Sequence, residues 1–278
     1  MRVAILGMGA IGQVVARALE GRADLVRVDR TRFPLRSGEP PVDAAVVCTK
    51  TYGTPWAAGV AAALLAPDGV AVTVQNGLGN LETLAEAVGP ARVSLGVIYV
   101  GARILPDGSL FATGPGRVEL GRPADPAARA SLEALGELLA QGGMGVSVVD
   151  DARPSVWRKL AVNAAMNPTT AIFGVTNGGL LGHPAAEPLS DALARETARV
   201  ATAVGVPLSE EEVVAAWRNT AKTLGENRSS MLNDLDVGKP TEIDAINGAV
   251  VREAERAGVE APTNEAITLL VKAVEKKV

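Results

Sequence analysis

The stretch that decides the fold is "RVAILGMGAIGQVVARALEG", residues 2–21. Residues 2–7 are a short apolar run of β type, and residues 10–21 follow with helical periodicity and close at Gly21. A second β-type run occupies residues 24–29, so strand, helix and strand succeed one another within about 30 residues. This spacing is typical of a βαβ unit, in which a helix connects two parallel strands.

The rest of the first half continues the alternation of β-type runs and alanine-rich helical stretches. Residues 44–50 and 70–76 are near-continuous apolar runs, which are typical of strands buried on both faces of a parallel sheet. Asp107-Gly108 lies between β-type runs within residues 104–121, and this dipeptide predicts a hairpin. The remaining expected elements of this half are a helix over 125–143 and a strand over 145–151.

The sequence pattern changes near residue 152, where β-type runs disappear and helical segments dominate. We therefore expect an α/β Rossmann-type domain with a parallel sheet over residues 1–150, followed by an all-helical domain over residues 151–278. Prolines near several of the expected helix starts agree with this reading, because proline is tolerated in a first turn. The expected helices of the second domain cover 153–172, 184–204, 209–225, 241–257 and 262–277.

Composition and charge exclude several classes of protein. The formal net charge of −4 disfavours a general nucleic-acid binder, which is usually basic. Cys48 is the only cysteine, so no internal disulfide can form and a reducing compartment is expected. Glycines close to the N-terminus disfavour a secretory signal. The sequence has no apolar run of about 18 residues, so we expect no membrane span. We expect a cytoplasmic protein without a metal site, and we read His183, the only histidine, as a surface residue.

The loop "GMGAIG" at residues 7–12 has the G-x-G-x-x-G spacing of a dinucleotide-binding turn. The pattern alone is weak, but here it follows a strand and opens the helix of a βαβ unit, as that fingerprint requires. A structural turn without a ligand is the alternative, and this context disfavours it. The expected roles are a tight turn, a close approach to the pyrophosphate, and helix packing against the strand. The expected cofactor-binding residues of the loop are Gly7, Met8, Gly9, Ala10, Ile11 and Gly12.

The end of the second strand bears on the choice of nicotinamide cofactor. Asp29 stands near where an acidic residue would hold a ribose diol, which would favour NADH. Arg30 and Arg32 follow, and guanidinium groups bind a 2′-phosphate well, which favours NADPH. Their alternative is a solvated loop. We expect NADPH, with NADH as the other candidate if Asp29 faces the ribose.

Two further polar residues are expected at the carboxyl ends of strands, where ligands bind in open parallel sheets. Lys50 ends the third predicted strand and could meet a phosphate or a substrate anion, although a surface lysine is equally common there. Asn76 follows the next strand in "QNGLGN" and could bind a ligand or simply form a turn with Gly77.

The helix in "VWRKLAVNAAMNPTTAIFG", residues 156–174, carries polar residues on an otherwise apolar segment. Lys159, Asn163 and Asn167 recur every four residues and therefore lie along one stripe. Each has a structural alternative, since lysines are common at surfaces and buried asparagines need some partner. Because Pro168 disfavours helix in the residue before it, Asn167 is expected at a kink or a helix end.

The chain resembles the ketopantoate reductase family, also called 2-dehydropantoate 2-reductase. The resemblance rests on "WRKLAVNAAMNPTTAIFG", on "ENRSSMLNDLDVGKPTEIDAINGAV" (226–250) and on "QNGLG" (75–79), together with the glycine loop. It implies NADPH-dependent reduction of 2-dehydropantoate to (R)-pantoate, a step towards pantothenate and coenzyme A. Related proteins include dimers, so a homodimer is among the expected assemblies.

The resemblance also implies roles for individual residues. Lys159 corresponds to the catalytic lysine, and hydride delivery to a ketone does require an acid for the resulting alkoxide. Glu242 is expected in the first turn of its helix, where Thr241 and Asp244 look like a capping box and a surface carboxylate is the alternative. The implied substrate-binding residues are Asn76, Asn163, Asn167, Ser230 and Glu242, and Arg30, Lys50 and Asn76 are implied to contact the cofactor.

Residues 31–43 depart from the family, because they hold too many prolines for a helix and could alter the adenine pocket. Two other functions stay open. The chain could be a reductase of another 2-oxo acid or a β-hydroxyacid dehydrogenase. It could also be a protein that senses NADPH without turnover, although Lys159 and Glu242 speak against this.

Overall fold

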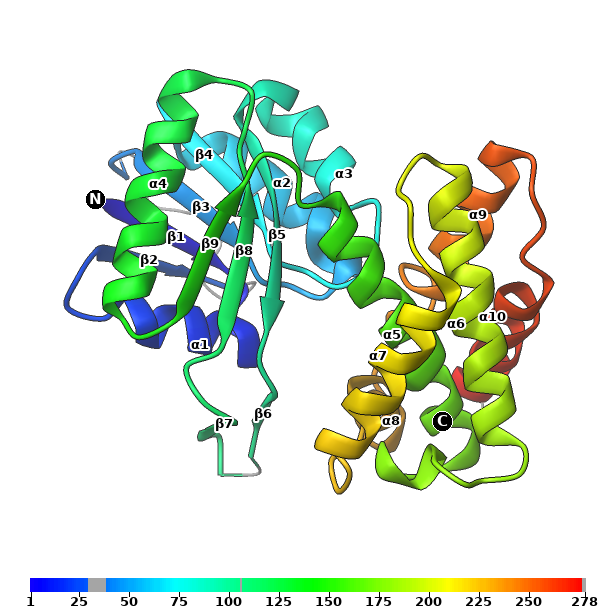
Figure 1. Ribbon diagram of the computed structural model, residues 1–278. Coiled ribbons are helices and arrows are strands. Elements are labelled where there is room, and N and C mark those ends of the chain that lie inside the picture. Colours follow the sequence, from blue (N-terminus) through cyan, green and yellow to red (C-terminus); the bar gives the residue numbers. More distant parts are fainter. Residues whose placement is uncertain (30–38, 106, 277–278) are drawn as a thin grey trace. The chain divides into compact units, whose positions relative to one another are not determined.

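The structure is a computed structural model that describes residues 1–29, 39–105 and 107–276 of the 278-residue chain. It divides into two compact units (Figure 1). The first comprises Met1–Gln75 and Gly79–Ala152, and the second comprises Asn76–Leu78 and Arg153–Val278. Arg30 and Arg32, expected near the cofactor, lie outside the described residues.

The first unit is built on a seven-stranded, mostly parallel sheet with the order β2-β1-β3-β4-β5-β8-β9. All pairs from β2 to β5 are parallel, and β8 reverses direction against β5 before β9 pairs parallel with β8. The expected α/β architecture is confirmed, with the last two strands at one end of the sheet, β8 and β9, running against the others. The strands are β1 Arg2–Leu6, β2 Asp24–Val28, β3 Val42–Val47, β4 Leu65–Thr73, β5 Val93–Tyr99, β8 Arg117–Gly121 and β9 Gly145–Val149.

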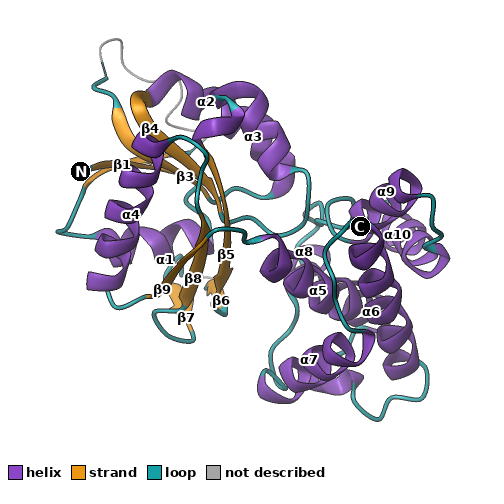
Figure 2. Cartoon of the chain, turned by 45° about the horizontal axis from the view of Figure 1, so that its top comes forward, coloured by secondary structure: helices purple, strands orange, loops and turns teal. Residues whose placement is uncertain are grey.

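Alternate residues of strand β1 face two different helical layers. Val3 and Ile5 pack with helices α1 (Ala10–Leu19) and α4 (Pro126–Gln141), whereas Ala4 and Leu6 pack with α2 (Thr54–Leu64) and α3 (Asn80–Val88). Successive strand side chains point to opposite faces, so both faces of the sheet are buried and apolar. The two helical layers are visible on either side of the sheet in Figure 2.

The predicted hairpin is confirmed as β6 (Ala102–Ile104) paired with β7 (Leu110–Ala112). Gly108 adopts φ +83°, and the carboxylate of Asp107 accepts the backbone N–H of Ser109 at 2.9 Å. These are the features that make an Asp-Gly pair favourable in a tight turn.

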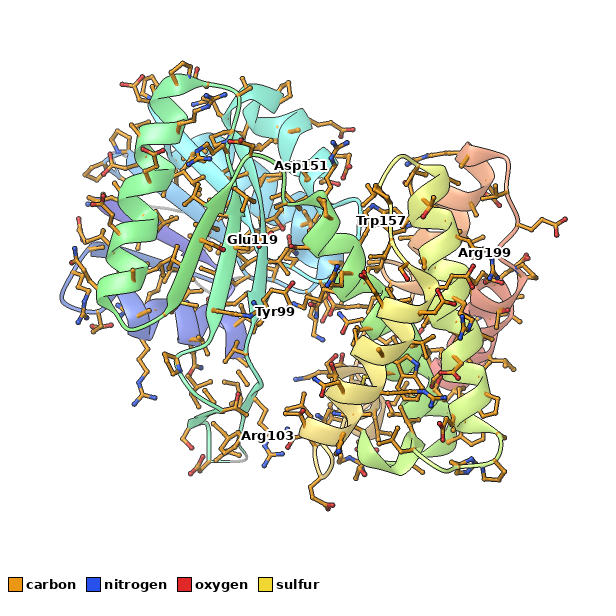
Figure 3. All side chains as sticks on the ribbon, viewed as in Figure 1. Tyr99, Arg103, Glu119, Asp151, Trp157 and Arg199 are labelled. Carbon is orange, nitrogen blue, oxygen red and sulfur yellow. The ribbon has the colours of Figure 1, made fainter. Side chains whose placement is uncertain are left out.

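The second unit contains helices and turns in its described part. Hydrophobic side chains of all six helices contribute to its core, with α5 giving the largest share, and Trp157 on α5 (Figure 3) is 5% exposed. No helix in the described parts of the chain has the length and apolar character needed to cross a membrane. The helices are α5 Arg153–Phe173, α6 Ala186–Ala203, α7 Glu210–Thr223, α8 Ser230–Asp236, α9 Asn247–Ala257 and α10 Pro262–Glu275.

One expectation about this unit was wrong. The helix predicted over 241–257 begins only at Asn247, because the preceding residues form a turn in which the Glu242 carbonyl accepts the N–H groups of Ala245 and Ile246. Glu242 therefore lies in a turn before α9 and not in its first helical turn. The helix expected over 153–172 is confirmed as α5. Of the two alternatives for Asn167, a helix end is excluded, because α5 continues through Pro168 to Phe173.

Candidate cofactor loop and active site

The glycine loop connects β1 to α1, and the spatial demands on its three glycines differ. A Cβ on Gly12 would lie 2.0 Å from the carbonyl oxygen of Gly7, and Gly7 itself has φ +100° with a Cβ position 2.7 Å from the Thr49 methyl group. Both glycines are therefore required by the chain itself. Gly9 is exposed and a Cβ there would meet nothing within 4 Å, so the protein does not explain why this residue lacks a side chain.

The same loop presents backbone hydrogen-bond donors. Gly9 is the N-cap of α1. The N–H groups of the first helical residues, Ala10, Ile11 and Gly12, have no acceptor within the helix. Met8 lies between the first two glycines and is half-buried. Because the helix dipole adds positive potential at this end, the loop can hold a phosphate group.

Lys50 lies close to the position expected for it, but not on a strand. Strand β3 ends at Val47, and Lys50 is the N-cap of a short 3₁₀ turn over Thr51–Gly53. It is half-buried at the carboxyl end of the sheet, on the same side as the glycine loop, since parallel strands end at one edge.

Sequence reasoning missed Gln75, which organises this edge of the sheet. Its Nε2 donates to the Thr49 carbonyl at 2.9 Å and to the Thr54 hydroxyl at 2.8 Å. The Thr54 hydroxyl in turn donates to Asn80 at 2.8 Å. Gln75 thus ties together the segments that follow β3 and β4, and its position next to Asn76 was the available signal.

The stripe on α5 forms as predicted. Lys159 and Asn163 are half-buried, and Asn167 is 8% exposed. Leu160, on the apolar side of the same helix, is 2% exposed and anchors α5 in the core. The stripe therefore runs from a partly accessible lysine to an almost buried asparagine.

The environment of Lys159 changes its acidity. The pKa of its ammonium is lowered from 10.5 to about 8, because burial lowers the pKa by more than the negative charge of Glu242 raises it. A cation that loses hydration is easier to deprotonate, whereas a nearby carboxylate stabilises the charged form. The result is a proton donor whose pKa lies near neutral pH, as acid catalysis favours.

The turn that carries Glu242 is hydrogen-bonded to a segment from the first half of the sequence. The backbone N–H of Leu78 donates to the Ala245 carbonyl at 3.0 Å. Gly77 has φ +80°, and a Cβ on it would lie 2.3 Å from the same carbonyl oxygen. Asn76–Leu78 therefore belongs to the second unit, and Asn76 lies beside the turn of Glu242, which is 6% exposed.

The two adjacent serines at the start of α8 differ in their surroundings. Ser229 is the N-cap, its hydroxyl accepts the N–H of Leu232 at 3.1 Å, and it lies 2.6 Å from the Thr170 hydroxyl. Ser230 is the first helical residue and is exposed. Ser229 thus has a structural role, which leaves the Ser230 hydroxyl accessible to a ligand.

Two models of one protein family match this chain. The family described as "Ketopantoate reductase PanE/ApbA" matches residues 26–125, and its C-terminal counterpart matches residues 151–275. The chain belongs to the ketopantoate reductase family. A 2-dehydropantoate 2-reductase of Archaeoglobus fulgidus is 34% identical over 295 aligned positions, covering 99% of this chain and 98% of the relative. The resemblance read from the motifs is confirmed, and the family comprises NAD(P)-dependent 2-oxo acid reductases.

Solved structures agree on the fold of this ketopantoate reductase family member. A PanE/ApbA family ketopantoate reductase from Ralstonia eutropha JMP134 superposes with a TM-score of 0.84 at 28% identity, covering 100% of this chain and 99% of the other. D-mandelate dehydrogenase in complex with NADH and anilino(oxo)acetate reaches a TM-score of 0.91 at 24% identity over 100% and 99% of the two chains. That second likeness concerns the fold alone, so substrate choice has to be argued from the site.

Proposed function

We propose that this protein reduces 2-dehydropantoate to (R)-pantoate with NADPH. The observation that carries the proposal is Lys159, a half-buried ammonium whose pKa is lowered to about 8 and which feels the charge of Glu242. A proton donor of this kind suits the reduction of a carbonyl group. In this proposal the α/β part, residues 1–150, binds the nucleotide, and the helical part, residues 151–278, binds substrate and supplies the acid.

The residues of the first unit suit a nicotinamide dinucleotide. The amides of the glycine loop would hold the pyrophosphate, and the open space over Gly9 allows the close approach that this contact needs. Lys50 would add a positive charge for a phosphate, and Asn76, which belongs to the second unit, would contact the nicotinamide end. When bound, the cofactor supplies the hydride, which leaves the protein to provide an acid and to orient the substrate.

The residues of the second unit complete the reaction. As hydride reaches the carbonyl carbon, the electron pair of the C=O bond moves to oxygen, and that oxygen takes a proton from Nζ of Lys159. Neutral Lys159 then regains a proton from solvent. The carboxylate of Glu242 accepts a hydrogen bond from the substrate hydroxyl and keeps Lys159 protonated before reaction. The amides of Asn163, Asn167 and Asn76 and the hydroxyl of Ser230 orient the remaining oxygen atoms of the substrate.

A substrate panel tests this function. We expect kcat/KM for 2-dehydropantoate to exceed that for 3,3-dimethyl-2-oxobutanoate, which lacks only the hydroxyl group, by at least about 100-fold, because a site that binds a hydroxyl leaves polar groups unpaired without it. Each substrate is assayed with NADPH and with NADH. Binding of NADPH without its oxidation by any 2-oxo acid would instead indicate a sensor.

Another 2-oxo acid is the alternative substrate, and an aryl one is included because a protein of the same fold, D-mandelate dehydrogenase, was solved with anilino(oxo)acetate. Phenylglyoxylate therefore belongs in the same panel. A kcat/KM for phenylglyoxylate above that for 2-dehydropantoate would replace the proposed substrate while leaving the proposed acid, Lys159, in place. Assembly as a homodimer stays an expectation, which the molar mass in solution would test.

Replacement of Arg30 by alanine tests the cofactor preference. We expect NADPH affinity to fall by about 10- to 100-fold and NADH affinity to change little, because a charged hydrogen bond to the 2′-phosphate is worth about 1.5–3 kcal/mol. The measurement is the dissociation constant of each cofactor by fluorescence titration. Arg27→Ala is a matched control, since Arg27 lies on β2 and pairs with Glu20. Equal losses for both cofactors would contradict the phosphate role.

The pH profile tests the link between Lys159 and Glu242. In the wild type, kcat/KM is expected to fall as pH rises through about 8, because Lys159 loses its proton there. In Glu242→Gln the charge that raises the pKa is removed, so this limb should move to lower pH. A limb at the same pH in both proteins would show that another group limits the rate.

A further inference from the structure

Pro168 removes one backbone hydrogen-bond donor from α5, and the side chain of a residue on another helix supplies a donor in its place. Proline has no N–H, so the carbonyl of Ala164, four residues earlier, loses its helical donor. The side chain of Asn247 fills this role, since its Nδ2 donates to the Ala164 carbonyl at 3.0 Å. Asn247 is fully buried at the first position of α9.

A buried carboxylate fixes the direction of the hydrogen bonds that lead to Asn247. Glu196 on α6 is 2% exposed, and its Oε1 accepts both the side-chain and the backbone N–H of Asn264, at 2.8 and 2.7 Å. The Oδ1 of Asn264 must then face Asn247 and accepts from its Nδ2 at 2.9 Å. Both hydrogens of that Nδ2 are thereby committed, one to Asn264 and the other to Ala164.

One buried acceptor of this network is left without a partner, so a contribution to stability does not by itself explain why the network is polar. The Oδ1 of Asn247 is buried and has no hydrogen-bond partner among the described residues. An unsatisfied buried acceptor is unfavourable, and an apolar replacement of the whole network would avoid it. Buried polar networks are retained in some proteins because they select one arrangement of the elements they join.

The elements joined here carry the candidate active-site residues of the second unit. Ala164 follows Asn163 on the helix of Lys159, and Asn247 follows directly on the turn that contains Glu242. The N–H of Gly248 donates to the Ile243 carbonyl at 3.0 Å, so the start of α9 and this turn form one piece of backbone.

We propose that Asn247 is a positioning residue: by binding the carbonyl that Pro168 leaves open in α5, it holds the turn of Glu242 in register with Lys159 and Asn163. The inference deepens the proposed function and rests on it for the roles of Lys159 and Glu242. The fit between the two elements does not depend on the identity of the substrate.

A double-mutant cycle tests the compensation between Asn247 and Pro168. Asn247→Ala is expected to lower the urea midpoint of unfolding, because the Ala164 carbonyl loses its donor. In the Pro168→Ala background the same change should lower the midpoint much less, because residue 168 then has an N–H for that carbonyl. Equal losses in both backgrounds would refute the compensation.

The positioning role has its own readout, which needs no turnover. The pKa of Lys159 is measured by NMR titration of labelled lysine, with the signal assigned by comparison with Lys159→Arg. A turn released from α5 places the Glu242 charge farther away, so the pKa should fall by at least about 0.3 units in Asn247→Ala. This fall should persist in the Pro168→Ala/Asn247→Ala double variant, in which α5 regains its backbone hydrogen bond but has no hydrogen bond to residue 247. We expect kcat to drop about 10-fold in Asn247→Ala and in the double variant. An unchanged pKa and kcat in folded Asn247→Ala would refute the proposal.

Ser190→Ala is the matched control, because the Ser190 hydroxyl donates at 3.0 Å to the next carbonyl of α5, that of Ala165, without contacting α9 through that bond. It should leave the Lys159 pKa and kcat unchanged. If Asn247→Ala does not fold, Asn264→Ala carries the pKa readout, since it removes the acceptor that orients Asn247. A pKa that moves as expected in a protein that reduces no 2-oxo acid would uphold the positioning and reject the proposed function.

Discussion

Replacing Lys159 with alanine is expected to lower kcat by about 10²- to 10⁴-fold while the affinity for the nicotinamide cofactor stays unchanged. The alkoxide formed by hydride transfer would lose both its proton donor and the positive charge that stabilises it. The phosphates of the cofactor are held in this proposal by the glycine loop and Lys50 of the first unit, so cofactor binding does not depend on this amine. Single-turnover oxidation of NADPH and a fluorescence titration separate the two quantities.

Arg158→Ala is the control for this prediction. Arg158 is the preceding residue on α5, but its side chain is exposed and pairs with Glu212 at 3.4 Å. Surface ion pairs of this kind contribute little to stability, about 0–1 kcal/mol, so the variant should behave like the wild type. A Lys159→Ala protein with an unimpaired rate would exclude the assignment of this lysine as the acid.

The second large effect concerns the glycine loop, where two alanine substitutions should fail for different reasons. Gly12→Ala is expected to destabilise the first unit and to abolish cofactor binding, because its Cβ would lie 2.0 Å from the Gly7 carbonyl oxygen. Gly9→Ala is expected to leave the free energy of unfolding within about 0.5 kcal/mol of the wild type, since its Cβ meets no protein atom within 4 Å. It should nevertheless weaken NADPH binding at least about 10-fold, because the added methyl occupies space that the pyrophosphate needs.

Urea unfolding and cofactor titration of both variants make this comparison. Gly59→Ala is a suitable control, because Gly59 lies exposed inside α2 with equally open space around its Cβ position. It should raise stability by about 0.5–1 kcal/mol and leave cofactor binding unchanged. If Gly9→Ala binds NADPH as tightly as the wild type, the loop is a structural turn and the cofactor assignment fails.

The parts of the fold that follow a strong local pattern could be predicted from the sequence. Strands β1 and β2 with α1 between them, the hairpin at Asp107-Gly108, and α5 are examples. Helix α2 was not delimited, because its alanine-rich sequence is apolar on every side and has no amphipathic period. The start of α9 was misplaced because Thr241 imitates an N-cap, whereas its hydroxyl accepts the N–H of Ile243 at 3.2 Å within a turn.

Local periodicity was therefore sufficient for the βαβ unit with its glycine loop and for the alignment of Lys159 with Asn163, because each depends on residues a few positions apart. Three other features depended on packing between distant segments. These are the contact of Gly77 with Ala245, the hydrogen bond from Asn247 to Ala164, and the lowered pKa of Lys159. No spacing in the sequence encodes them, since burial, unfilled carbonyls and neighbouring charges arise only when the folded chain brings these segments together.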